Sequence, residues 1–481
     1  MKAAINRRSF LTSAAFGTGA LLTGCGDSGK PLQWFKNPAS GSKNPASGSK
    51  NPASGSKNPA SGSKNPASGS KDGLLLPENE WNIPSELSDK ADDGKDLKVA
   101  LIGCGNRGTG AALDMLNAAD GVSITVLADL FADRLETARK TLKEKRNQQI
   151  SDNRCFTGFD SYLKAIDTDV DLVILATPPA FRPQHFKASV EAGKHVFFEK
   201  PAAVDPVGAR SVIASSKIAL NKGLAVITGT QRHHQRSYIE SYKHIQRGLI
   251  GNIVAARIYW NTGKHWLKYK QKEWTDIEWM IRDWGNWTWL SGDHIVEQHV
   301  HNIDVINWFT GSHPIRATAM GAHQRRATGD QYDMFAVDYV YPSGMHTSSM
   351  SRQIDGCSNN ISEHLVGTKG TWQNNGVIKD HAGNVLWKYD KEKEKQEFKQ
   401  TNEFVLEHVN LINHIRHSKP ISHAELTAVS SLTAIMGRIS AYTGKDVTWQ
   451  QMMQSDLNIV PNDLTLRNVD MKQYAFAVPG Q

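Results

Sequence analysis

The feature that most constrains the fold of this chain is the pattern G-x-G-x-x-G at residues 103–108, which directly follows a short apolar segment. A helical pattern comes next, and then a second apolar segment that ends at Asp129. In such a unit Gly103 permits a tight turn, Gly105 lets a pyrophosphate approach the backbone, and Gly108 lets a helix pack closely on a strand. We therefore predict a strand–turn–helix unit whose helix start binds a dinucleotide.

The acidic residue lies about 20 positions past the glycines, where it would accept hydrogen bonds from ribose hydroxyls. Because its carboxylate repels a 2′-phosphate, Asp129 favours NAD over NADP. Arg107 and Arg134 lie near enough in sequence to keep NADP as an alternative. A glycine-rich turn in an unrelated α/β protein is the competing interpretation, and the surrounding alternation of strand and helix patterns disfavours it.

This alternation continues to about residue 230, which predicts a doubly wound Rossmann domain at 96–230. Its later strands end at Thr177-Pro178, at Glu199-Lys200-Pro201 and near Gln231. Ligands bind at the carboxyl ends of such strands. We therefore expect a cofactor site made of Gly103, Gly105, Asn106, Arg107, Gly108, Asp129, Thr177, Pro178, Glu199, Lys200 and Gln231.

After residue 250 the pattern changes to longer strands that are separated by turn signals. This favours a domain at 231–455 that binds substrate and forms oligomer contacts, followed by a tail at 456–481. The predicted fold class is α/β, with an N-terminal Rossmann doubly wound sheet and a C-terminal α+β domain that contains a large open, mostly antiparallel sheet.

One helical pattern interrupts the second half, from about His294 to Phe309, and Asp293 is placed to cap it. Glu297 and His301 stand four residues apart, which puts them on one face of a continuous helix. A carboxylate one turn before a histidine orients the ring and raises its basicity. The pair is therefore a candidate proton acceptor for a sugar hydroxyl, and a purely structural polar helix is the alternative.

The same segment contains four side chains of metal-ligand type: His294, Glu297, His299 and His301. On a helix His299 faces away from the others. The remaining three lack the compact spacing of helical zinc sites. We therefore expect no metal.

Aromatic and basic side chains near these motifs are further candidates. Trp284, Trp287 and Trp289 form either a core cluster or a sugar-stacking platform. Core packing is the better interpretation for at least two of them, and we assign Trp284 to substrate binding. Arg232 and His233 follow the last strand of the Rossmann pattern, so we expect them to contact substrate together with His301.

From about residue 95 to 450 the chain resembles the glucose–fructose oxidoreductase/inositol dehydrogenase (Gfo/Idh/MocA) family. The resemblance rests on the glycine pattern, Asp129, Glu199-Lys200-Pro201, the segment "HNIDVINW" and the closing "GRISAYTGKDVTW". It implies hydride transfer between a carbinol carbon and a nicotinamide, with Lys200 stabilising the alkoxide and His301 accepting the proton.

The resemblance also implies two structural features. A C-terminal helix at about 404–441 would return to pack on the Rossmann domain, and the open sheet would pair copies into a dimer or tetramer. The family commonly has Asp four residues before the histidine, where this chain has Glu297. Glutamate keeps the negative charge and is longer by one methylene, so we expect the same role with a carboxylate that reaches farther.

The N-terminal residues 1–24 have the layout of a signal peptide, with basic residues before an apolar run that is too short to span a bilayer. Arg7-Arg8 resembles a twin-arginine export signal, with an ordinary secretory signal as the alternative. Leu-Thr-Gly-Cys resembles a lipobox that would leave a lipid on Cys25. Five NPASGSK repeats then predict a flexible tether within 25–95.

The tether also accounts for the charge. Residues 1–71 hold ten Lys/Arg and one Asp, whereas the whole chain carries a formal net charge of +8, so the rest is close to neutral. The basic balance therefore gives no argument for nucleic acid.

Export raises the question of how an NAD enzyme would obtain its cofactor. Twin-arginine export carries folded proteins, so we expect a periplasmic or cell-surface lipoprotein with a tightly held NAD. We expect it to transfer hydride from a sugar or glycoside. The alternatives are a redox-assisted, oxidation–elimination glycosidase and a non-catalytic sugar-binding lipoprotein.

Overall fold

Seven parallel strands form the first sheet of the computed structural model, in the order β15-β6-β5-β4-β1-β2-β3. The structure describes residues 84, 87–374 and 376–480. The strands are β1 Leu97–Ile102, β2 Val122–Asp129, β3 Cys155–Thr157, β4 Leu172–Leu175, β5 His195–Phe198, β6 Ala225–Thr228 and β15 Ile421–Ser422. The expected signal peptide, Cys25 and the repeats lie outside the described residues.

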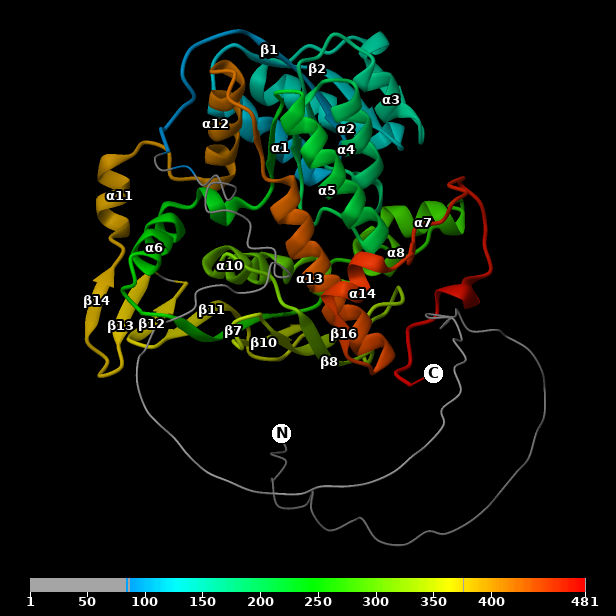
Figure 1. Ribbon diagram of the computed structural model, residues 1–481. Helices are drawn as coiled ribbons and strands as arrows, with labels where there is room; N and C mark the ends of the chain where they lie inside the picture. The colour runs from blue at the N-terminus through cyan, green and yellow to red at the C-terminus, as the bar shows by residue number, and fades with distance from the viewer. Residues whose placement is uncertain (1–83, 85–86, 375, 481) are drawn as a thin grey trace, which may run out of the picture. The chain divides into compact units, whose positions relative to one another are not determined.

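Helices cover both faces of this sheet, which is why its central strands are continuous apolar runs. On one face lie α1 Asn106–Ala118, α2 Ala132–Arg146 and α12 Glu403–Arg416. On the other lie α3 Ser161–Ile166, α4 Arg182–Glu191 and α5 Pro206–Asn221. Figure 1 shows this layer above the second sheet. The predicted doubly wound Rossmann domain is confirmed.

The second sheet has nine strands in the order β14-β13-β12-β11-β7-β10-β9-β8-β16. Within the described part of this second sheet, only the β7–β10 pair is parallel, so the expected mostly antiparallel sheet is confirmed. The strands are β7 Ile253–Thr262, β8 Arg316–Ala322, β9 Met334–Val340, β10 His346–Gln353, β11 Asn360–Gly367, β12 Gly370–Gln373, β13 Val377–Asp380, β14 Val385–Lys388 and β16 Val447–Thr448.

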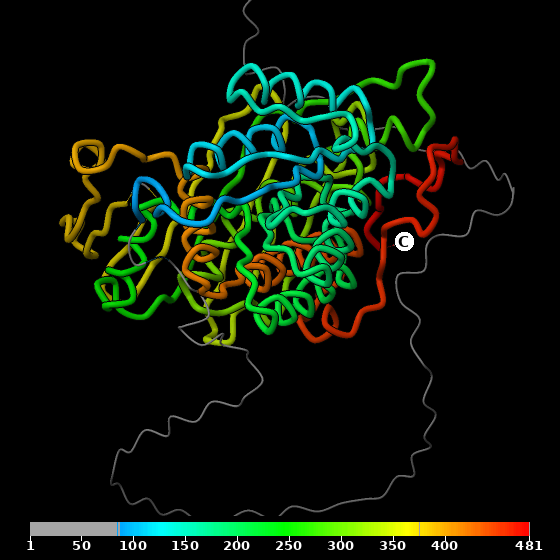
Figure 2. The backbone as a smooth tube through the Cα atoms, turned by 90° about the horizontal axis from the view of Figure 1, so that it is seen from above, coloured from blue at the N-terminus to red at the C-terminus, as the bar shows by residue number. Residues whose placement is uncertain are grey.

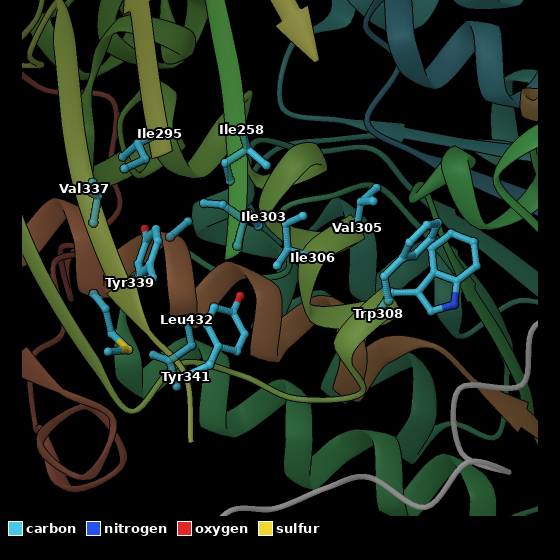
Figure 3. Close-up of a cluster of buried hydrophobic side chains, with 14 of the residues drawn as sticks. Ile258, Ile295, Ile303, Val305, Ile306, Trp308, Val337, Tyr339, Tyr341 and Leu432 are labelled. Atoms are coloured by element: carbon cyan, nitrogen blue, oxygen red, sulfur yellow. The ribbon is translucent and has the colours of Figure 1, made fainter. Parts of the chain in front are cut away.

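One face of this sheet packs against α10 Val300–Thr310 and α13 Ala424–Thr443. Figure 3 shows the contact, in which Ile258 and Tyr339 of the sheet meet Ile306 of α10 and Leu432 of α13. The remaining helices are α6 Arg236–Gln246, α7 Asp276–Arg282, α8 Thr288–Ser291, α9 His294–Glu297, α11 Lys391–Glu397 and α14 Trp449–Gln454, with short 3-10 turns that include η4 Gln231–His234 and η5 Trp284–Asn286.

The expectation of one C-terminal helix at about 404–441 is wrong. The segment forms two helices, α12 and α13, and β15 between them joins the Rossmann sheet beside β6. Pro420 lacks an amide hydrogen and cannot continue a helix, and Ser418 has a positive φ of 52°. Within the described part of the chain, no helix is long and apolar enough to cross a bilayer.

Two buried histidines make the folded state sensitive to acid. Burial lowers the pKa of His185 and of His299 to about 3 in each case. The unfolded chain binds a proton at each near pH 6.5. It therefore holds more protons than the folded chain below that pH, and stability falls as the pH drops from about 6.5 toward 3.

At about pH 5 we expect each of these histidines to cost about 2 kcal/mol of unfolding free energy. Urea unfolding at about pH 7.5 and about pH 5 measures this loss. The variant His299→Gln should show a smaller loss between the two pH values than the parent protein. Equal losses in both proteins would contradict the assignment to His299.

Candidate active site

Two glycines in the turn between β1 and α1 cannot be replaced by residues that carry a side chain. A Cβ on Gly103, which has a φ of +96°, would lie 2.6 Å from the backbone of Thr177. A Cβ on Gly108 would lie 1.9 Å from the carbonyl oxygen of Gly103. Gly105 differs, because only the Arg134 guanidinium comes within 4 Å of its Cβ position. The open side of the turn therefore lies at Gly105.

A pocket of about 720 Å³, counting its solvent-open part, lies beside this turn. Gly103, Gly105, Asp129, Thr177 and Pro178 line it from the carboxyl ends of β1, β2 and β4. The open backbone at Gly105, the start of α1 at Asn106 and the acidic strand end together fit a dinucleotide.

The carboxylate of Asp129 is fixed at the end of β2. Oδ2 accepts the amide hydrogen of Cys104 at 2.6 Å, and Oδ1 accepts that of Phe131 at 2.9 Å. Burial raises the pKa of Asp129, and these two backbone hydrogen bonds oppose that shift. The carboxylate is thereby held at the pocket wall, where it can accept hydrogen bonds from ribose hydroxyls.

The Glu199-Lys200-Pro201 motif follows β5 and connects the two halves of the site. Arg107 pairs with Glu199 and lies 3.4 Å from the buried Glu407 of α12. Lys200 Nζ donates to the backbone oxygen of Glu297 at 2.5 Å and to its Oε1 at 3.0 Å. The lysine of the Rossmann domain is thereby held by a carboxylate of the second domain.

Glu297 and His301 do not form the pair expected from a continuous helix. The helix is broken, because α9 ends at Glu297 and α10 begins at Val300. The Glu297 oxygens accept hydrogen bonds from Lys200 and Gln298 instead. Burial opposes ionisation of Glu297, but the charge of Lys200 prevails and lowers the pKa of this carboxyl. Glu297 therefore positions the lysine and does not position the histidine.

A strained residue holds this broken segment in place. Asp293 has a φ of 74° and a ψ of 161°, a conformation found almost only in glycine. Its Oδ2 accepts the amide hydrogen of Tyr332 at 2.9 Å and the hydroxyl of Tyr442 at 2.5 Å. The predicted cap is present, because Oδ1 of Asp293 accepts the amide hydrogen of His294. Tyr332, just before β9, and Tyr442 of α13 anchor the other carboxylate oxygen.

His301 is 9 % exposed and stacks on Trp260 of β7, with ring centroids 5.6 Å apart. Burial lowers its pKa well below the ordinary value, and the charges of Lys200 and Arg232 add to the effect. The imidazole is therefore neutral at neutral pH and able to accept a proton. Arg232 lies over the same indole at 5.9 Å and pairs with the buried Glu363.

Two of the expected substrate contacts lie elsewhere. His233 is fully buried, with its Nε2 2.7 Å from Asp304 and its ring against Trp308, so it serves the core. Trp284 lines the pocket near Asp129, at the cofactor end. Trp287 and Trp289 are each 3 % exposed and belong to the core, as expected for two of the three tryptophans.

The residues that sequence reasoning missed include Trp260, Glu363 and His185. His185 lines the pocket and its Nδ1 lies 3.2 Å from the Thr177 hydroxyl. No local pattern marks these side chains, because each comes from a different element. Among the described residues, no group of three His, Cys, Asp or Glu is arranged to hold a metal ion.

A Rossmann sheet with this turn, and a second domain that brings a carboxylate to its lysine, define a two-domain dinucleotide-dependent oxidoreductase. A family model described as an oxidoreductase family with an NAD-binding Rossmann fold matches residues 97–229. A second, the GFO/IDH/MocA C-terminal domain, matches residues 238–373. Together they cover more than half of the chain, which belongs to the Gfo/Idh/MocA family of NAD-binding oxidoreductases.

Individual relatives match parts of the chain. A glycosyl hydrolase family 109 protein of Streptomyces coelicolor is 36 % identical over 23 % of each chain. The 2,7-anhydro-N-acetylneuraminate hydratase of Escherichia coli is 27 % identical over 42 % of this chain and 50 % of its own length. The chain thus spans between about a quarter and a half of these curated relatives.

Solved structures match over a longer range. The scyllo-inositol dehydrogenase of Lactobacillus casei, solved with NAD(H) and scyllo-inositol, has a TM-score of 0.54 at 19 % identity. The match covers 73 % of this chain and 99 % of that one. At this identity the likeness shows the shared fold.

Substituting Gly105 tests the cofactor site. The variant Gly105→Val should fold, since the glycine has ordinary dihedrals and open space at its Cβ. It should bind NAD at least tenfold more weakly, about 1.4 kcal/mol or more, because its side chain fills the open side of the turn. Titration calorimetry on cofactor-free protein measures the affinity.

The matched control is Gly110→Ala in α1, where the added Cβ meets only a guanidinium atom at 3.7 Å. It should bind NAD as the parent protein does. If the Gly105→Val variant binds NAD as tightly as the parent protein does, the cofactor does not bind at this turn.

Proposed function

We propose that this protein oxidises a secondary hydroxyl of a sugar or glycoside, using a tightly held NAD. The observation that carries the proposal is the hydrogen-bonded pair of Lys200 and Glu297, which joins the strand end of the Rossmann domain to the segment that bears His301. A bound NAD would accept hydride from the carbinol carbon.

The geometry of Lys200 supports its role at the substrate oxygen. An ammonium has three N–H donors, and two of them point to acceptors of Glu297. The third is left for a substrate oxygen, where it would stabilise developing negative charge. Because Glu297 is buried and ionised, it fixes the ammonium in this orientation before substrate arrives.

His301 supplies the proton acceptor. Its neutral imidazole takes the hydroxyl proton as the C–H bond breaks. Stacking on Trp260 holds the plane of the ring, and the same indole offers an apolar surface to the C–H face of a sugar. Arg232 beside it provides N–H donors that suit sugar hydroxyls.

The N-terminal sequence supports the proposal of tight cofactor binding. A twin-arginine signal and a lipid on Cys25 would place the folded protein outside the cytoplasm, where free NAD is not supplied. We infer that the cofactor travels inside the folded enzyme and is restored by returning hydride to a second sugar or to the same substrate.

The relatives favour one alternative. Two of them carry the names of a glycosyl hydrolase and an anhydrosugar hydratase. In an oxidation–elimination route the transient ketone acidifies the neighbouring C–H, whose proton leaves as the glycosidic C–O bond breaks. Water then adds to the double bond and hydride returns to the ketone. Measuring keto-sugar formation beside aglycone release from aryl glycosides separates the two functions.

Replacing the lysine tests its role. We expect Lys200→Ala to lower turnover at least about 100-fold, because the substrate oxygen loses its charged donor, while NAD stays bound. The exposed Lys187→Ala is the control and should retain full turnover. Turnover and bound NAD are measured on the same preparations, and unchanged turnover in Lys200→Ala removes the lysine from the mechanism.

The pH profile tests His301. Because burial and the Lys200 charge lower the pKa of this imidazole, it stays neutral well below pH 6.5. The rate of oxidation should therefore stay level from about pH 8 to about pH 6.5 and fall only at lower pH. The variant His301→Asn should lose most of the oxidation rate, and its remaining rate should no longer fall at low pH. If the rate of that variant still falls at low pH as in the parent protein, another group accepts the proton.

A further inference from the structure

The Rossmann domain does not build the pocket beside Asp129 alone. Ile281 of α7 and Trp284 of η5 line the same pocket, although they lie far along the chain in the second domain. We call residues 276–291, which comprise α7, η5 and α8, the clasp. In the dinucleotide crevice the end next to the acidic residue receives the adenosine half of the cofactor. The clasp therefore faces adenosine.

Arg282 attaches the clasp to the Rossmann domain. Its two terminal nitrogens each donate to a carboxylate oxygen of Asp133 at 3.1 Å, which is a bidentate pair. Its guanidinium also lies 3.8 Å from the ring centroid of Phe131, another residue of the pocket wall. The pair thus links the clasp to the start of α2, beside the pocket.

The C-terminal tail at 456–480 supports the clasp from the other side. The amide of Ile277 donates to the backbone oxygen of Arg467 at 3.1 Å, and the amide of Val469 donates to Asp276 at 3.0 Å. The rings of Tyr474 and Trp287 form a T-shaped contact with their centroids 6.0 Å apart. Figures 1 and 2 show the tail, in red, running beside the α7 region.

We propose that the clasp and the tail form a latch that closes over the adenosine half of NAD and slows its release. The latch rests on the proposed function, in which NAD is retained through many turnovers. Ile281 and Trp284 offer apolar surface to adenine, and the Arg282–Asp133 pair ties the clasp to the Rossmann domain beside the pocket. Residues that strengthen a closed state act mainly on the dissociation rate.

The test measures NAD release from the full-length holoprotein, with an NAD-consuming enzyme in the solvent to prevent rebinding. Asp133→Asn weakens the link to Arg282 without altering a residue that lines the pocket. Tyr474→Ala removes the tail contact. The control is Asp152→Asn, which breaks an exposed ion pair with Arg139 on the same domain.

We expect release to be about fivefold faster in Asp133→Asn and in Tyr474→Ala, and unchanged in Asp152→Asn. Melting of the cofactor-free proteins shows whether either substitution merely loosens the fold. Slow release in the parent protein with no acceleration in either variant overturns the latch and leaves the proposed function standing. Immediate release from the parent protein overturns both.

Discussion

The contact between Lys200 and Glu297 is the interaction on which the candidate site depends. It joins residues 97 positions apart, one at the end of β5 and the other at the end of α9. Both side chains are about 90 % buried, and burying an unpaired charge is costly. Each buried charge therefore requires the other as its partner, and this ion pair holds the second domain against the nucleotide crevice.

The segment that carries Glu297 is itself held by local strain. Asp293 adopts a conformation that few side chains tolerate, and its carboxylate accepts hydrogen bonds from Tyr332, just before β9, and from Tyr442 of α13. The break between α9 and α10 follows within a few residues. Because of that break, Glu297 turns to the lysine while His301 turns to Trp260. The break thus separates two roles that a continuous helix would combine.

The proposed retention of the cofactor follows from the proposed export. An enzyme that works where NAD is not supplied must bind its cofactor in the cytoplasm and release it slowly. The pocket beside Asp129 has walls from the Rossmann domain and from the clasp, and the tail lies beyond both matched family regions. The tail could thus serve the cofactor retention that the proposed export would require.

The nucleotide turn, Asp129, the Rossmann domain and the open second sheet could be predicted from the sequence alone, because contiguous periodicity and glycine spacing specify such elements. The three-dimensional fold was needed to show that Glu297 pairs with Lys200, that His233 lies in the core and that Trp284 lines the pocket beside Asp129. Those outcomes depend on contacts between distant segments and on the helix break between Glu297 and Val300. A local sequence pattern does not specify which distant side chain will pair with a buried charge.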